Sequence, residues 1–541
     1  MTTTQDALAD ARPLGRHQAH ERVPRSSGLA AWSLYAVVAL DVVVGTYYRF
    51  TTTSKMWLDE AQTVNIASLP ARTIPHELRL DGAPPLYYEL LHFWMGLVGH
   101  SDSAIRSLSG LFGVLALPVM WLVVRRGFGK LEGILALAVL AASPFAVYYS
   151  TEARMYSLVT LLVTAGIGAV QALLARPTVP RAALVSVLAA LLLYTHYWSL
   201  YLLLVVGVWL LYVALRAGKQ RRRSAVYGLS ALVVAGLTFL PWVPTFLYQR
   251  AHTGTPWASA PTLASVYGWL AGFVFNQQVQ NETLSLHLEV GLLSFIGLLI
   301  LGFAAAPAGR DRLEFRLTGQ PRSRVLAFVA IGTLAVGWVA SRAAGTAFQP
   351  RYSSVVFPVM VVLVALGIVA LPSRWLQVAV LVVASVASLW TVHWGAHAQR
   401  SQAGKAAVML HAVVPSGSVV VVCPDQLGPS LLRYAGTTTY HYVGFPRFEP
   451  PKIVDWIDYK HVVEQTSLTV FAHRVTALAG SSPFYLVWSK GYGYHQVCSD
   501  FVSTLSTVSA RSPKTLLVAK KYVYYQSMNL LEYPPADAPT P

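Results

Sequence analysis

Long apolar runs, separated by short polar loops, occupy the first three quarters of the chain. About 20 consecutive apolar residues suffice to cross the hydrocarbon core of a bilayer as an α-helix. The pattern predicts about eleven spanning segments, near residues 28–49, 104–125, 131–149, 156–175, 181–198, 200–216, 225–245, 287–306, 325–343, 353–371 and 374–392. The chain is therefore predicted to be a polytopic α-helical membrane protein.

Composition agrees with this prediction. Charged residues make up 12% of the 541 residues, whereas a soluble domain has about one quarter. The formal charge of +17 does not indicate a nucleic-acid partner, because the basic residues lie in short loops where membrane topology explains them. Residues 1–27 are polar and lack the apolar core of a signal peptide, which is typical of a cytosolic tail.

The basic loops predict the orientation of the spans. If the N-terminus is cytosolic, the richest groups of lysine and arginine share one side: Arg125, Arg126 and Lys130; Arg176 and Arg181; Arg216 to Arg223; Arg310 to Arg324; and Arg374. The positive-inside rule assigns that side to the cytoplasm. The 51–102 loop, the 246–286 loop and the C-terminus then face outward. Within the 246–286 loop, the uncharged stretch 263–276 is typical of an interfacial or re-entrant helix.

The pattern changes after residue 395, which closes the predicted transmembrane domain 28–395. Gly417 to Val422, Phe484 to Trp488 and Leu516 to Tyr525 are predicted strands, and Asp425 is a candidate N-cap for a helix through Leu432. Residues 396–541 are thus predicted to form an exported α/β domain. Its end, from Tyr533 to Pro541, is Pro-rich and expected to be disordered.

Both cysteines, Cys423 and Cys498, lie in this C-terminal domain. An oxidising compartment would allow a disulfide between them, and two buried free thiols are the alternative. No Cys/His spacing is typical of zinc, and no nucleotide-binding loop is present. We expect no metal and no nucleotide cofactor.

The polar loop 51–102 carries the strongest candidate chemistry. It begins with Trp57-Leu58-Asp59-Glu60, and a carboxylate facing a cavity can take a proton from an attacking hydroxyl. A solvated loop acid is the plainer interpretation of Asp59. Tyr87 and Tyr88, later in the loop, provide aromatic surface that suits a sugar site or a membrane-interface belt.

Three further clusters share the predicted outer side. Tyr148 to Tyr156 contains Glu152 and Arg154, which would form an ion pair or position an anionic group. Tyr194 to Trp198 contains His196, and Gln349 to Tyr352 contains Arg351. Arginine suits phosphate because its planar fork makes paired charge-assisted hydrogen bonds. Each arginine is otherwise explained as a helix-end anchor.

The order of these features resembles the GT-C integral membrane glycosyltransferases, in particular the protein O-mannosyltransferase-like and lipid A aminoarabinose transferase-like enzymes. The resemblance covers about residues 28–372. It rests on Trp57-Leu58-Asp59-Glu60, Ala83-Pro84-Pro85-Leu86-Tyr87-Tyr88, Ala104-Ile105-Arg106-Ser107-Leu108-Ser109, Ser150 to Tyr156, Pro241-Trp242-Val243-Pro244 and Pro350-Arg351-Tyr352.

This resemblance implies transfer of a sugar, with inversion, from a polyprenyl-phosphate carrier to an extracytoplasmic acceptor. Asp59 would be the general base, and Glu60 would shape the site or contact the acceptor. The remaining roles are donor-phosphate binding by Arg351, Arg154, His196 and Tyr352, and substrate binding by Tyr87, Tyr88, Glu152, Tyr156 and His76. The lysine that contacts phosphate in some relatives is replaced here by Arg72, His76 and Arg79.

Mannose is the first expectation for the sugar and a pentose such as arabinose the next, with a lipoglycan or polysaccharide of the cell envelope as acceptor. A protein O-mannosyltransferase is the alternative within the class. From other classes, a transporter or flippase, or a non-catalytic assembly factor, stays open. We expect a multi-pass plasma-membrane protein whose partners are membrane lipids, the lipid-linked donor and the acceptor.

Overall fold

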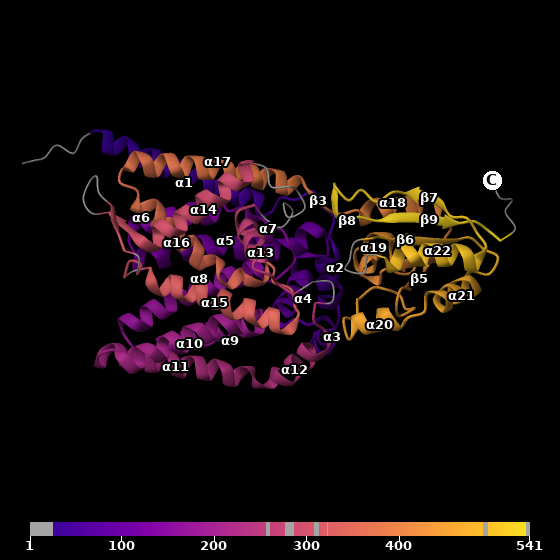
Figure 1. Cartoon of the computed structure of the whole chain (residues 1–541), viewed down its shortest axis with the longest axis horizontal. Helices are drawn as coiled ribbons and strands as arrows, with labels where there is room; N and C mark the ends of the chain where they lie inside the picture. Colours follow the sequence, from indigo (N-terminus) through magenta and orange to yellow (C-terminus); the bar gives the residue numbers. More distant parts are fainter. Residues whose placement is uncertain are drawn as a thin grey trace, which may run out of the picture.

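The structure is a computed structural model that describes residues 25–255, 260–275, 286–307, 313–316, 318–321, 323–490 and 496–536. A bundle of long helices occupies one end and a smaller α/β domain the other, with α2 and α3 at the junction (Figure 1). Most of the predicted 1–27 tail and the last five residues of the Pro-rich end lie outside the described residues.

The helical part contains α1 (Arg25–Tyr48), α2 (Leu58–Ala67), α3 (Ile74–Asp81), α4 (Leu86–Val98), α5 (Asp102–Gly127), α6 (Lys130–Ala142), α7 (Pro144–Ser150), α8 (Tyr156–Ala175), α9 (Val179–Thr195), α10 (Trp198–Arg216), α11 (Lys219–Phe239), η1 (Leu240–Trp242), α12 (Val243–His252), α13 (Ala264–Phe275), α14 (Leu286–Ala304), the short strands β1 (Ala305–Pro307) and β2 (Leu313–Phe315), α15 (Arg324–Ala344), η3 (Tyr352–Val355), α16 (Phe357–Ala370) and α17 (Arg374–His397).

Each predicted span coincides with a helix or a bent helix pair. Among the described residues, seven helices are long and apolar enough to cross a membrane, and the bent pair α6 and α7 makes eight. The helices α9, α14 and α16 are apolar but shorter. The prediction of a multi-pass helical membrane protein is confirmed.

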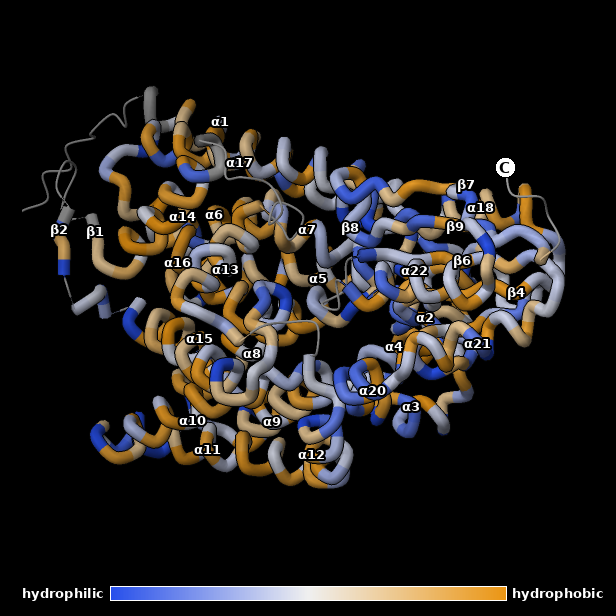
Figure 2. The backbone as a smooth tube through the Cα atoms, turned by 45° about the vertical axis from the view of Figure 1, so that its right-hand side comes forward, coloured by the Kyte–Doolittle hydropathy of each residue, from blue (hydrophilic) through white to orange (hydrophobic). Residues whose placement is uncertain are grey.

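The outer surface of the bundle is apolar. Large apolar side chains on α1, α10 and α17 are exposed, among them Trp32, Leu215, Val383 and Trp390. Figure 2 shows orange, hydrophobic segments throughout the bundle, while paler and blue segments gather toward the junction with the C-terminal domain. Apolar side chains exposed in this way are stable when lipid covers them.

One predicted span is broken. The segment 131–149 divides into α6 and α7, which meet at an angle of 56°. Ser143 has extended backbone and caps α7 by accepting a hydrogen bond from the Ala146 amide, and Pro144 is the first residue of α7. Proline has no amide hydrogen to continue the helix from α6, so the chain bends there. The predicted helix within 263–276 is present as α13.

The 51–102 loop folds into α2, α3 and α4. The apolar faces of these helices pack into the bundle, with Val64, Leu78 and Leu91 buried in its core. Trp57 and Leu58, at the start of α2, instead belong to the core of the C-terminal domain. The loop therefore joins the two parts of the molecule.

The C-terminal domain contains β3 (Gln399–Ser401), α18 (Ala403–Val413), β4 (Val419–Cys423), η4 (Asp425–Leu427), α19 (Gly428–Ala435), β5 (His441–Gly444), α20 (Tyr459–Gln465), α21 (Leu468–Ala479), β6 (Phe484–Trp488), α22 (Val497–Ser509), β7 (Lys514–Leu517), β8 (Tyr524–Gln526) and β9 (Asn529–Tyr533). The main sheet has the order β5-β4-β6-β9-β7, in which β5, β4 and β6 are parallel and β9 and β7 antiparallel to their neighbours. All five residues of β4 are buried, as expected for a central strand covered on both faces.

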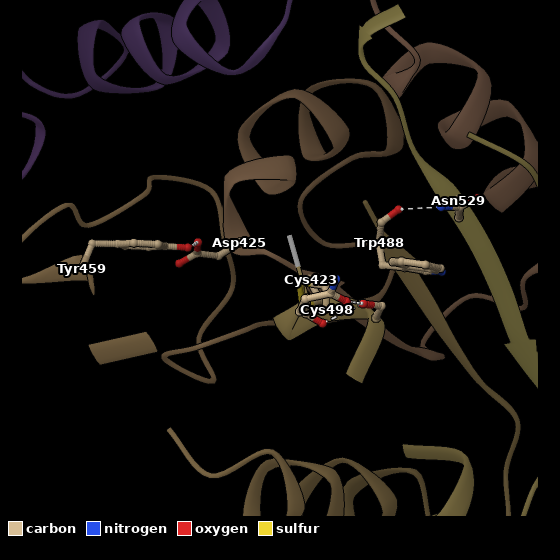
Figure 3. Close-up of a disulfide and its surroundings, with 8 residues drawn as sticks. Cys423, Asp425, Tyr459, Trp488, Cys498 and Asn529 are labelled. Atoms are coloured by element: carbon tan, nitrogen blue, oxygen red, sulfur yellow. Dashed lines mark hydrogen bonds between the residues drawn. A yellow bond between two sulfur atoms is a disulfide. The ribbon is translucent and has the colours of Figure 1, made fainter. Parts of the chain in front are cut away.

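Two local predictions in this domain are wrong. The expected strand from Leu516 to Tyr525 is divided between β7 and β8, which belong to different sheets. Asp425 does not cap a helix, because it is the first residue of η4 and its carboxylate accepts a hydrogen bond from the Tyr459 hydroxyl. Figure 3 shows this pair beside the end of β4.

Cys423 and Cys498 form a disulfide that joins the end of β4 to α22 (Figure 3). Both residues are buried, and the bond closes a sequence separation of 75 residues. A covalent link across so long a segment restricts the unfolded chain and so favours the folded domain.

Replacing both cysteines by alanine is expected to lower the free energy of unfolding of the C-terminal domain by about 2–4 kcal/mol, because the unfolded segment regains its freedom. Mass spectrometry of unreduced wild-type protein should find the two cysteine-containing peptides joined, and denaturation with and without reductant measures the stability difference. Free thiols at both positions would contradict the pairing.

Candidate active site

The first turn of α2 presents two adjacent acids to different surroundings. Consecutive residues of an α-helix point about 100° apart, so Asp59 and Glu60 cannot face the same neighbours. Trp57, just before the helix, has extended backbone and sets the direction from which the chain enters. The helix dipole favours carboxylates in this first turn.

Glu60 is fully buried in an ion cluster. Its two oxygens accept hydrogen bonds from Nε and Nη2 of Arg106 on α5, both at 2.7 Å. The Ala153 amide donates to the same carboxylate at 3.1 Å, and Arg400 lies 3.7 Å from it. Burial raises the pKa of Glu60, but the charge and hydrogen bonds of Arg106, the charge of Arg400 and the hydrogen bond from the Ala153 amide outweigh burial and bring it below the ordinary value. This geometry favours a role in shaping the site over direct contact with an acceptor.

Asp59 points away from the Arg106 side chain and stays partly accessible. Its side chain is 20% exposed, and Oδ2 lies 3.4 Å from Nη1 of Arg351, whose side chain is 6% exposed. Arg351 comes from the segment just before η3, and its guanidinium lies over the rings of Trp57 and Tyr352 at 5.6 and 5.2 Å. The fold thus places the accessible carboxylate of Asp59 beside the buried guanidinium of Arg351, which belongs to the last part of the bundle in sequence order.

Arg154 forms the neighbouring part of the site. Its Nη1 donates to Thr63 Oγ1 at 2.8 Å and to the Tyr88 hydroxyl at 3.2 Å. Tyr88 in turn donates to Asp81 at 2.6 Å. Arg154 therefore lies against α2 and α4, and the expected ion pair between Glu152 and Arg154 does not form.

Glu152 is buried beside the cluster. Its Oε1 accepts a hydrogen bond from the Trp57 indole at 2.8 Å, while Oε2 has no hydrogen-bond partner among the described residues. Burial raises the pKa of Glu152 to about 7, against the opposing charge of Arg400. A carboxyl group with this pKa is partly protonated at neutral pH.

His196 lies behind the two arginines. It sits between α9 and α10, buried, with its ring centroid 5.9 Å from that of Tyr156 and 6.2 Å from that of Tyr352. Nδ1 of His196 accepts a hydrogen bond from the Trp198 amide at 3.2 Å. The ring is neutral in this arrangement, and its other nitrogen can donate a hydrogen bond without adding charge.

The structure gives less support to a substrate-binding role for the two remaining candidates, Tyr87 and His76. Tyr87 is buried on α4, and its hydroxyl bonds to Ser109 at 2.7 Å, which is a packing role. His76 is exposed on α3 and makes no hydrogen bond or ion pair with these residues in the described part of the chain. No group of three or more His, Cys, Asp and Glu side chains that could hold a metal occurs among the described residues.

Several residues of the site were not predicted. Arg106 belongs to the motif from Ala104 to Ser109 that contributes to the family resemblance, but only the fold shows that it binds Glu60. Arg400 follows the last span with no recognisable pattern, yet it donates to the carbonyl and hydroxyl oxygens of Thr151 at 2.8 and 2.7 Å. Tyr525, on β8, reaches the site from the C-terminal domain. Its ring lies 5.2 Å from that of Trp57, and it is an electrostatic neighbour of Arg351.

Comparison with solved structures identifies the overall fold of the chain. No protein-family model matches the sequence, and no curated protein matches it at a significant level. Among solved structures, ArnT from Cupriavidus metallidurans in the apo state aligns over 94% of this chain and 98% of its own, with a TM-score of 0.53 at 13% identity.

The chain has the GT-C fold. ArnT bound to undecaprenyl phosphate aligns equally well, with a TM-score of 0.53 at 14% identity over 94% of this chain and all of ArnT. An oligosaccharyltransferase from Archaeoglobus fulgidus aligns over 88% of this chain and 71% of its own, with a TM-score of 0.47 at 11% identity. The alignment with ArnT covers nearly the whole length of both chains, so the GT-C architecture includes the C-terminal domain as well as the bundle.

Glu152 makes the stability of this GT-C chain depend on pH. Its pKa is about 7 in the folded state and near the ordinary 4.5 in the unfolded state. Between these values the folded state binds more protons, so stability falls as pH rises from about 4.5 to about 7. Relative to Glu152→Gln, the wild type should lose up to about 3 kcal/mol across this window. Parallel stability curves for the two proteins, from denaturation at several pH values, would contradict the assignment.

Proposed function

We propose that this chain is an inverting glycosyltransferase that moves a sugar from a polyprenyl-phosphate carrier to an acceptor hydroxyl. The observation that carries the proposal is the Asp59–Arg351 pair. It combines a partly exposed carboxylate, able to accept a proton, with a buried guanidinium, able to receive a phosphate. ArnT, whose fold this chain shares, has been crystallised with undecaprenyl phosphate, which supports a lipid-phosphate donor here.

Asp59 acts as the general base. The acceptor hydroxyl approaches the anomeric carbon from the face opposite the carrier phosphate. As its oxygen forms the new glycosidic bond, its proton passes to Asp59 and the bond from the anomeric carbon to the phosphate oxygen breaks. One direct displacement requires one base and inverts the anomeric centre. Glu60 cannot share this role, because both of its oxygens are held by Arg106.

Arg351 receives the departing charge. The leaving phosphate gains negative charge in the transition state, and a fixed cation in a site shielded from water stabilises such charge best. When the donor phosphate binds Arg351, it replaces Asp59 as the partner of this guanidinium and leaves the carboxylate free to accept a proton. Arg154 adds a second cation, and neutral His196 and Tyr352 supply supporting hydrogen-bond donors.

The site is proposed to face the outside of the plasma membrane. Four basic residues lie at or beside helix ends: Arg125, Arg176 and Arg216 near the C-terminal ends of α5, α8 and α10, and Lys130 at the start of α6. If consecutive spans alternate in direction, these ends lie on the membrane face opposite to α2. The positive-inside rule supports a cytoplasmic position for those ends. The C-terminal domain, joined to α2 through Trp57 and Leu58, would then be extracytoplasmic and contribute Tyr525 to acceptor binding.

For the sugar we propose mannose first and a pentose such as arabinose next, with a lipoglycan or polysaccharide acceptor and a protein acceptor as the alternative. No metal cofactor is required, because the arginines supply the positive charge. Asp41 lies within the first span, and an acid in such a position is typical of a transporter. It is buried and accepts a hydrogen bond from Ser385 on α17 at 2.7 Å, which supports a packing role between α1 and α17.

Asp59→Asn should reduce transfer by about 10²- to 10⁴-fold while the protein stays folded, because the amide keeps the shape of the side chain and loses its basicity. Purified protein, assayed with a panel of lipid-linked sugars against cell-envelope extracts, provides the measurement. Asp458→Asn is the matched control, since that acid pairs with His252 outside the site. Undiminished transfer in Asp59→Asn would remove the base from the mechanism.

Arg351→Ala should raise the apparent KM for the lipid donor by about tenfold or more, with a smaller change for the acceptor, because a charge-assisted contact to phosphate is lost. Arg342→Ala, which removes an exposed arginine at the end of α15, should leave both constants unchanged. Steady-state kinetics with each substrate varied in turn distinguishes the effects. An unchanged donor KM would support the helix-end anchor role instead.

A further inference from the structure

A polar cavity lies on the side of Arg106 where the first loop meets the C-terminal domain. Its volume is about 410 Å³, within the range of small-molecule sites. The walls come from the α1–α2 connection, the start of α5, the end of α7 and α19, and include Arg49, Lys55, Asp102, Arg106 and Tyr434. Neither Asp59 nor Arg351 lines it.

The cavity has more positive than negative charge around it. Three cations line it, namely Arg49, Lys55 and Arg106. The carboxylates in ion-pair contact with the wall, within the described residues, are Glu60, held by Arg106 and Arg400, and Asp102, held by Arg433 and the Tyr434 hydroxyl. Of the three cations in the wall, Arg106 is paired with Glu60, whereas Arg49 and Lys55 form no ion pair with a carboxylate among the described residues. An anion in the cavity would neutralise their charge.

Arg49 is the least compensated of these cations. It is 1% exposed, and Nη1 and Nη2 donate to the carbonyls of Gly45, Ala141 and Leu140 at 2.8–2.9 Å. It forms no ion pair with a carboxylate of the described chain, and its buried Nε has no hydrogen-bond partner there. A buried donor left unpaired in this way costs about 1–3 kcal/mol.

The cavity is situated at the ends of two membrane spans. Arg49 and Phe50 directly follow α1, while Asp102 and Ser103 begin α5. Phe50 is 50% exposed and provides an apolar edge. Lys55 is exposed, with Nζ 5.0 Å from the centre of the Tyr434 ring. A ligand entering here would meet apolar surface on the span side and cations inside.

We propose that this cavity binds the phosphate-bearing headgroup of an anionic membrane lipid. Lys55 would contact the phosphate, the buried charge of Arg49 would add to the attraction, and the acyl chains would lie against the exposed side of α1. This second phosphate site does not depend on the transfer reaction, because its lining does not include the proposed base or the donor-phosphate arginine.

Binding of dioctanoyl phosphatidylglycerol to purified full-length protein tests the proposal. We expect saturable binding that weakens at least about fivefold in Lys55→Glu and less in Lys55→Gln. Lys405→Glu is the matched control, because Lys405 is likewise exposed over a tyrosine ring, 5.7 Å from the centre of Tyr524, but does not line the cavity. Its affinity should stay within about twofold of wild type.

Competition by two further ligands tests whether the site requires the phosphate, the lipid, or both. Dioctanoylglycerol, which lacks phosphate, should not compete, and inorganic phosphate should compete only weakly. Equal binding of dioctanoylglycerol, or equal weakening in Lys405→Glu, would overturn the site. Inorganic phosphate that binds as tightly as the lipid would overturn the lipid assignment. Asp59→Asn should bind phosphatidylglycerol normally, so a failed transfer mechanism and a failed lipid site give different results.

Discussion

The structure depends on one buried carboxylate. Glu60 accepts two hydrogen bonds from Arg106 and one from the Ala153 amide, and it lies near Arg400. Through these contacts α2 is fixed to α5, to the break between α7 and α8, and to the start of the C-terminal domain. A buried carboxylate is stable only when its charge and lone pairs are satisfied, and here segments far apart in the sequence combine to satisfy it.

The position of Asp59 follows from this cluster. Because Glu60 fixes the rotation of α2, the side chain of Asp59 is turned away from the cluster and lies beside Arg351. Two adjacent acids thereby acquire different surroundings, one closed in an ion cluster and one partly accessible. The C-terminal domain takes part as well, since Arg400 completes the cluster and Tyr525 lies near Arg351. The catalytic arrangement that we propose is therefore a property of the whole chain.

The spans and the candidate charged residues could be predicted from the sequence for identifiable reasons. Apolar runs have a length set by the bilayer, so each of the eleven segments coincides with a helix or a bent helix pair, whereas breaks such as the one at Pro144 were not predicted. Asp59, Arg154 and Arg351 could be selected because charges are rare in so apolar a chain. Arg106, the partner of Glu60, could not be selected from the sequence, because it lies 46 residues away and only tertiary packing brings the two side chains together. Arg400 and Tyr525 belong to a domain without a recognised motif, so no local pattern connected them with the site.

A double-mutant cycle on Glu60 and Arg106 tests the central claim most directly. Glu60→Gln and Arg106→Gln, each made alone, remove the closest partner of the other buried charge, and each should lower the free energy of unfolding by about 3–5 kcal/mol. The double variant leaves neither of the two charges, so its loss should be smaller than the sum of the two by at least about 2 kcal/mol. Effects that add within about 0.5 kcal/mol would show that the pair does not hold the junction together, contrary to this account.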